Sequence, residues 1–240
     1  MTKLALIPNL RQRHLLAALA GAAVIATASP ATASAQSACD GLGGKVDADQ
    51  ICQVHSATPA YAIDMSIPLD YPDQQAVTDY LTQDRADFLD WIAKFAPGGR
   101  NRPYMHDVTA KTYRSGTSAS GTQSMVLTID DDTGLSHEDH PGTSYQAFNY
   151  DLGKHAPVTF DTLFKPGTDP LQVLNPIVQR QLGKHTDAPV RDDLDATTYQ
   201  NFALTDDAVI FFFGEDQVVA DNNGPHQISV PRSELASLLM

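Results

Sequence analysis

The sequence is poor in basic residues and in cysteine. Its 240 residues include 16 lysines and arginines against 29 aspartates and glutamates, and only two cysteines. An acidic balance of this size disfavours nucleic acids and anionic lipid surfaces as partners, because both carry negative charge. The same charge favours solubility.

The chain also lacks a hydrophobic run long enough to span a bilayer. The apolar run Leu15–Ala28 has fourteen residues, and it follows a basic segment without acids. That pattern, followed by the small residues of ATASA, is typical of a secretory signal peptide rather than of a membrane helix. We expect cleavage after Ala35, an extracellular mature chain of residues 36–240, and no integral membrane segment after cleavage.

Both cysteines, Cys39 and Cys52, lie near the start of the expected mature chain. An exported chain with two cysteines most simply pairs them, and in the chain-entropy model a loop of this size contributes about 3 kcal/mol. Two alternatives are free thiols and lipid attachment at Cys39. Gln36, at a position where lipoproteins have an aliphatic residue, argues against the lipid.

Local catalytic motifs are missing. The sequence has no P-loop, no Rossmann fingerprint and no CxxC motif. The stretch GTSASG at 116–121 has the wrong spacing for the G-x-S-x-G elbow of α/β-hydrolases, and it joins two expected strands. The possible nucleophiles are Ser118, Ser120, Ser124 and Ser144, and the possible bases are His106, His140 and His226. The sequence alone brings none of them together, so we assign no catalytic residue and no cofactor.

Two stretches, one rich in histidine and one acidic, contain residue types that bind metals. In HEDH, at 137–140, the histidines are three residues apart in a loop rich in glycine and proline, whereas a zincin needs them one helical turn apart on a rigid helix. A mixed site of His137, Asp139 and His140 remains an alternative. Asp130–Asp132 lacks the alternating acids and central glycine of an EF-hand and indicates a solvated acidic turn. We expect no metal at either place.

The periodicity of apolar residues predicts an α+β fold with a mostly antiparallel sheet and packed helices. Residues 60–69 alternate as a strand that Pro68 places at an edge or an end. Residues 73–96 carry a helical stripe, and Arg102–Ile129 form a hairpin with a flexible tip. The remaining expected elements are strands at 143–152, 201–213 and 224–231, a helix at 169–182 that Pro176 kinks or delays, and a final helix at 232–239.

Several stretches resemble a known family. CDGLGGKVDADQICQV, PAYAIDMSIPLDYPDQQAVTDYL, SYQAFNYD, TFDTLFKPGTDPLQVLNPIVQRQL and YQNFALTDDAVIFFF are similar to the mycobacterial secreted immunogenic protein family. The C-terminal part resembles the extracellular domain of RsiV-type anti-sigma factors. The resemblance implies a β-grasp-like part and an N-terminal disulfide. We expect a signal peptide, 1–35, and one domain, 36–240, with an N-terminal half of about 36–130 and, as the resemblance implies, an RsiV-like half of about 131–240.

The resemblance also bears on function. It implies that His140, just before the strand SYQAFNYD, and Tyr145 have a structural or binding role. We predict a secreted, immunogenic, monomeric protein that is not an enzyme and that contacts an unknown protein of the host or the cell envelope. Some relatives are described as esterases, so the alternative is a secreted or cell-wall carboxylesterase with a serine nucleophile.

Overall fold

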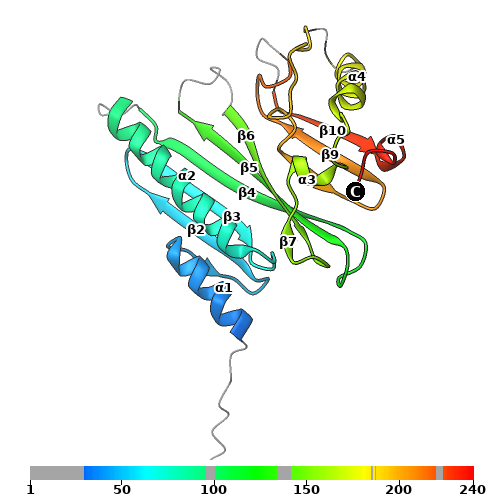
Figure 1. Ribbon diagram of the computed structural model, residues 1–240. Helices are drawn as coiled ribbons and strands as arrows, with labels where there is room; N and C mark the ends of the chain where they lie inside the picture. Colours follow the sequence, from blue (N-terminus) through cyan, green and yellow to red (C-terminus); the bar gives the residue numbers. More distant parts are fainter. Residues whose placement is uncertain (1–29, 96–100, 134–141, 185, 187, 220–223) are drawn as a thin grey trace, which may run out of the picture.

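A long mixed sheet dominates the computed structural model, which describes residues 30–95, 101–133, 142–184, 186, 188–219 and 224–240 (Figure 1). The seven strands lie in sequence order from β1 to β7. Their bounds are β1 Lys45–Val46, β2 Ile51–Ala57, β3 Tyr61–Pro68, β4 Tyr104–Ser115, β5 Thr122–Asp132, β6 Gly142–Asp151 and β7 Ala156–Pro157. All neighbouring pairs are antiparallel except β3 and β4. The predicted α+β class with a mostly antiparallel sheet is confirmed.

The parallel pair follows from one helix, α2 (Gln74–Phe95), which joins β3 to β4 and lies across the sheet (Figure 1). The Asp73 carboxylate accepts the amide N–H of Ala76 at 3.3 Å and begins the helix. The apolar stripe then packs on the sheet through buried side chains that include Leu81 and Phe88. This helix on a mixed sheet matches the β-grasp-like part that the resemblance implied. Of the two positions that Pro68 indicated, an edge strand or a strand end, the structure has the second: β3 ends at Pro68, and β2 and β4 flank the strand.

The expected hairpin is present as β4 and β5, with residues 116–121 as its tip. Gly116 has a φ of +72°, and its amide donates to the Asp206 carboxylate at 2.7 Å. The expectation that Asp130–Asp132 form a solvated turn is wrong, because these residues continue β5. Their side chains alternate between the two faces of the sheet and find different partners there.

The C-terminal unit has its own three-stranded sheet and a separate core. Its elements are α3 Phe160–Leu163, α4 Leu171–Leu182, β8 Phe202–Leu204, β9 Ala208–Phe213, β10 His226–Pro231 and α5 Arg232–Leu235. The helix α4 runs through Pro176. Phe211, Phe212 and Phe213 are all buried, so both faces of β9 are covered.

The C-terminal unit packs on the face of the main sheet that α2 leaves uncovered. On β5, Met125 and Leu127 belong to the core under α2, whereas Val126 packs with Ala203 and Phe212 of the C-terminal unit. Successive residues of a strand point to opposite faces, so the two layers lie on opposite sides of the sheet. We call these sides the helix face and the open face.

Polar side chains fix this docking. On the open face, the buried Ser124 hydroxyl accepts the Leu204 amide at 3.0 Å, and the buried Asn149 amide donates to the Phe202 carbonyl at 2.9 Å. Asn201 bonds along the outer edge of β6, donating to the Tyr145 carbonyl at 2.8 Å and accepting the Ala147 amide at 3.0 Å. These bonds pair backbone groups that would otherwise be left without partners at the seam.

The N-terminal region is held by the disulfide Cys39–Cys52, with a Cα–Cα distance of 5.5 Å. It joins α1 (Pro30–Gly41) to β2, and both cysteines are completely buried. The guanidinium of Arg85 on α2 donates to the Leu42 carbonyl at 3.0 Å and ties the same loop to the helix. The predicted disulfide is confirmed. Within the described residues, no helix combines the length and the apolar character needed to cross a bilayer.

Candidate functional site

The structure keeps the described candidate nucleophiles away from His106. Ser124 is buried at the seam with its hydroxyl bonded to Leu204. Ser120 lies at the hairpin tip and shares a 2.9 Å hydrogen bond with Thr117, and Ser118 is exposed beside it. Ser144 is exposed on β6, on the helix face, where Ile129 is its neighbour across β5. The HEDH quartet at 137–140, which includes the candidate base His140, lies outside the described residues.

His106 is enclosed between α2 and the sheet. Its side chain is 1% exposed, with Nδ1 at 2.7 Å from Asp131 Oδ1 and Nε2 at 3.4 Å from Asp84 Oδ2. Its ring stacks on Phe88 with centroids 4.9 Å apart. Burial raises the pKa of the Asp84 carboxyl, an effect that the nearby His106 opposes. Because the ring has a carboxylate at each nitrogen and no exposed surface, it braces the helix against the sheet rather than serving as a base for a bound substrate.

Tyr145, the other predicted site residue, lies on the open face of β6. Its ring packs against Phe212 of the C-terminal unit with centroids 5.4 Å apart. Burial raises the pKa of the Tyr145 phenol, with a smaller contribution from the negative charge of Asp130. Tyr145 therefore has a packing role at the seam and borders the acidic part of the open face.

That acidic part is a row of residues directly opposite one another across five strands. From β2 to β6 the paired residues are His55, Asp64, Asp107, Asp130 and Thr143. Neighbouring strands are about 4.8 Å apart, so three carboxylates follow one another at close spacing on one face. We call Asp64, Asp107 and Asp130 the aspartate row.

The two ends of the row have partners within the protein. The His55 ring nitrogen Nδ1 lies 2.6 Å from Asp64 Oδ1, and the Thr143 hydroxyl donates to Asp130 at 2.6 Å. The side chain of Asp107, in the centre, makes no hydrogen bond and no ion pair with the described residues. Burial raises the pKa of its carboxyl, and the negative charges of Asp64 and Asp130 raise it further. The row is thus a place where negative charge is held at a cost to the folded state.

A shallow hollow of about 560 Å³ lies over the row on the open face of β2 to β5. Its wall also contains Ser66, Thr109 and the 36% exposed Met105, so the surface around the carboxylates combines small polar and apolar side chains. The C-terminal unit contributes no residue to this lining. The hollow can accept a ligand or a protein side chain from solvent, and its charge favours a cation.

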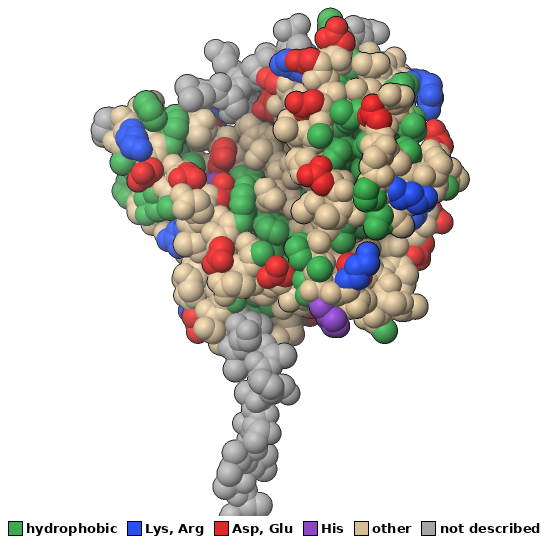
Figure 2. Space-filling view, viewed as in Figure 1, with side chains coloured by type: hydrophobic (Ala, Val, Ile, Leu, Met, Phe, Trp, Pro, Cys, Tyr) green, Lys and Arg blue, Asp and Glu red, His purple; other side chains and the backbone are tan. Residues whose placement is uncertain are grey.

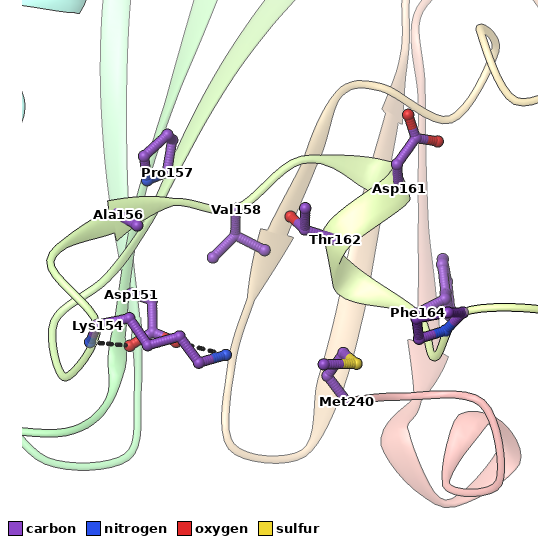
Figure 3. Close-up of a pocket in the computed structure, with 10 residues that line it drawn as sticks. Asp151, Lys154, Ala156, Pro157, Val158, Asp161, Thr162, Phe164 and Met240 are labelled. Carbon is purple, nitrogen blue, oxygen red and sulfur yellow. Dashed lines mark hydrogen bonds and ion pairs between the residues drawn. The ribbon is translucent and has the colours of Figure 1, made fainter.

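A second hollow, of about 350 Å³, lies where β6, β7 and α3 meet the C-terminal residue Met240 (Figure 3). Its wall is mostly apolar, with Val158 and Phe164 among its members. The Asp151 carboxylate accepts the backbone amide of Lys154 at 2.9 Å and pairs with its ammonium at 3.4 Å (Figure 3). The pKa of Asp151 is lowered, mainly by the hydrogen bond from the Lys154 backbone amide and to a smaller extent by the Lys154 side chain. The charged pair therefore stabilises the β6–β7 turn.

On the face seen in Figure 2, carboxylates are spread over both halves of the molecule, and apolar side chains gather in the middle of the view. No group of three or more histidine, cysteine or acidic side chains among the described residues is arranged to hold a metal ion. The aspartate row itself was missed by the sequence reading. The alternation of apolar and polar residues places each aspartate on the outward side of its strand, but only the strand register shows that the three are neighbours.

The fold and the comparisons with known proteins define the class of this chain. Residues 161–233 match a family described as a protein of unknown function, DUF3298. A solved DUF3298 protein from Bacteroides fragilis has a TM-score of 0.51 at 14% identity and covers 79% of this chain and 92% of its own. Another, from Pseudomonas aeruginosa, has a TM-score of 0.50 at 14% identity, with coverage of 81% and 96%. These similarities concern the fold.

Sequence relatives are more specific. Esterase Rv3036c of Mycobacterium tuberculosis is 45% identical over 230 residues, which are 94% of this chain and 99% of the relative. Immunogenic protein MPB64 of Mycobacterium bovis and immunogenic protein MPT64 of Mycobacterium tuberculosis are each 41% identical over 213 residues, 87% of this chain and 91% of the relative. The chain belongs to the family of these mycobacterial immunogenic proteins and Esterase Rv3036c. The predicted family is confirmed.

Proposed function

We propose that this chain is a secreted, monomeric protein that acts by binding another protein and not by catalysis. The observation that carries the proposal concerns Ser124 and His106: the Ser124 hydroxyl is bonded to the Leu204 amide, and His106 is enclosed by two carboxylates. An esterase needs a serine beside a histidine and a fixed oxyanion site. The open face, by contrast, keeps a solvent-accessible hollow that neither core fills.

The relatives support the same proposal. Two of them are named immunogenic proteins, which fits a protein displayed to a host. The signal-like N-terminus and the disulfide are typical of an exported chain. The proposed partner is a protein of the host or of the cell envelope.

The second candidate function is a serine esterase, which the name Esterase Rv3036c favours at 45% identity. Ester hydrolysis separates the two candidates. We expect residues 36–240, purified with the disulfide intact, to hydrolyse p-nitrophenyl butyrate at a rate that rises linearly with substrate. Saturable turnover that one change among Ser118→Ala, Ser120→Ala, Ser124→Ala and Ser144→Ala abolishes, while the circular dichroism spectrum is kept, would overturn the proposal.

A further inference from the structure

The main sheet has one face that is only half covered. The C-terminal unit packs against β4, β5 and β6 through Tyr113, Val126 and Tyr145. Around the aspartate row, the open-face side chains of β2, β3 and β4 meet solvent, since they line the hollow of about 560 Å³. This uncovered part of the open face is a sheet surface without a partner among the described residues.

The charges on that surface are unfavourable for the isolated protein. Like charges directly opposite each other in a sheet destabilise the pair, and here Asp107 has such a neighbour on both sides. His55 and Thr143 compensate the outer carboxylates only. A row with a purely structural role would have a neutral or basic residue at its centre. An unpaired central aspartate instead suits a cation that comes from outside.

The surroundings of the row allow a side chain to reach it. Ser66 and Thr109 are small, and the exposed Met105 offers an apolar contact for the stem of a long side chain. A guanidinium has a planar set of donors that can bond two carboxylates at once, whereas a phosphate backbone or an anionic membrane would be repelled. The fitting occupant is therefore an arginine or lysine on the surface of a protein.

We propose that the uncovered part of the open face docks a partner protein through basic side chains that insert between Asp64, Asp107 and Asp130. This inference rests on the proposed function, since it names the surface and the partner chemistry of the binding protein. The partner presents arginine or lysine at the centre of its contact, and binding weakens as salt is added.

The test uses residues 36–240 with the disulfide intact and a defined probe, an acetylated and amidated tri-arginine peptide. NMR titration at low salt is expected to shift the amide signals of Asp64, Asp107 and Asp130 more than those of α2. Asp107→Asn should weaken binding of the peptide by at least about threefold and make that binding less dependent on salt. The matched control is Asp90→Asn, which removes the same charge from an exposed site on α2 where the side chain is 73% exposed.

Equal weakening by Asp90→Asn and Asp107→Asn would show attraction to net charge alone and would overturn the docking surface. The same holds if the shifted signals cluster outside β2 to β5. Either result leaves the proposed function standing, because that function is decided separately by saturable ester hydrolysis. Unfolding does not confuse the outcome, since Asp107→Asn relieves repulsion in the free protein and should fold at least as well as the parent.

Discussion

Asn201 offers the sharpest test of how the C-terminal unit is joined to the sheet. Its side-chain amide makes the hydrogen bonds that a neighbouring strand would make with the edge of β6: it donates to the Tyr145 carbonyl at 2.8 Å and accepts the Ala147 amide at 3.0 Å. The Glu215 amide continues the same edge, donating to the Thr143 carbonyl at 2.9 Å. Asn201→Ala therefore removes two bonds and leaves two backbone groups without partners at a half-buried seam.

The expected cost follows from the two bonds. A hydrogen bond contributes about 0.5–1.5 kcal/mol net, and an unpaired buried group costs more, so Asn201→Ala should lower the free energy of unfolding by about 1–3 kcal/mol. Guanidinium titration of residues 36–240, followed by tryptophan fluorescence and circular dichroism, measures the change. The control is Gln200→Ala, which removes an exposed side-chain amide that donates to the Ala196 carbonyl at 2.7 Å. A loss below about 0.5 kcal/mol for Asn201→Ala, equal to the control, would refute this reasoning.

Three further changes test other parts of the account. Replacing Cys39 and Cys52 by serine should cost about 3 kcal/mol of unfolding free energy, and dithiothreitol should reproduce that loss in the parent protein. His106→Ala should cost about 2–4 kcal/mol in urea unfolding, because it leaves two carboxylates facing each other beneath α2; no loss would contradict the bracing role. Asp107→Asn should raise the free energy of unfolding at pH 7 by about 0.2–1 kcal/mol. Its folded pKa is raised, so the penalty of the ionised parent, and with it the gain of the variant, should disappear as pH falls through that pKa; a gain independent of pH would contradict the assignment.

Much of the fold could be predicted because the periodic pattern of apolar residues repeats many times in a long helix or strand. The stripe of α2 extends over six turns, and the hairpin of β4 and β5 has a glycine-rich tip. The strand β2 was missed because its inward side chains are few, with Cys52 and Val54 the only two that are buried. Pro68 indicated an edge or an end of β3, and it is the last residue of the strand, where a missing amide costs little.

The candidate site could not be predicted, because it depends on register. Asp64, Asp107 and Asp130 lie in separate segments, and nothing in the local sequence of any one of them shows that the three are neighbours. The run Asp130–Asp132 was misread as a turn for a related reason. Its charges are tolerated in a strand because Asp131 pairs with His106 and Asp132 pairs with Arg102, both from other segments of the chain.

Carboxyl footprinting of the mature protein with a captured partner tests the central claim most directly. Residues 36–240 are used to capture protein from cell-envelope and host extracts, and aspartates are labelled by carbodiimide coupling before and after the complex forms. The account predicts that labelling of Asp64, Asp107 and Asp130 falls in the complex while labelling of Asp90 on α2 is unchanged. Unchanged labelling of the row, with protection on α2 or on the C-terminal unit instead, would contradict it.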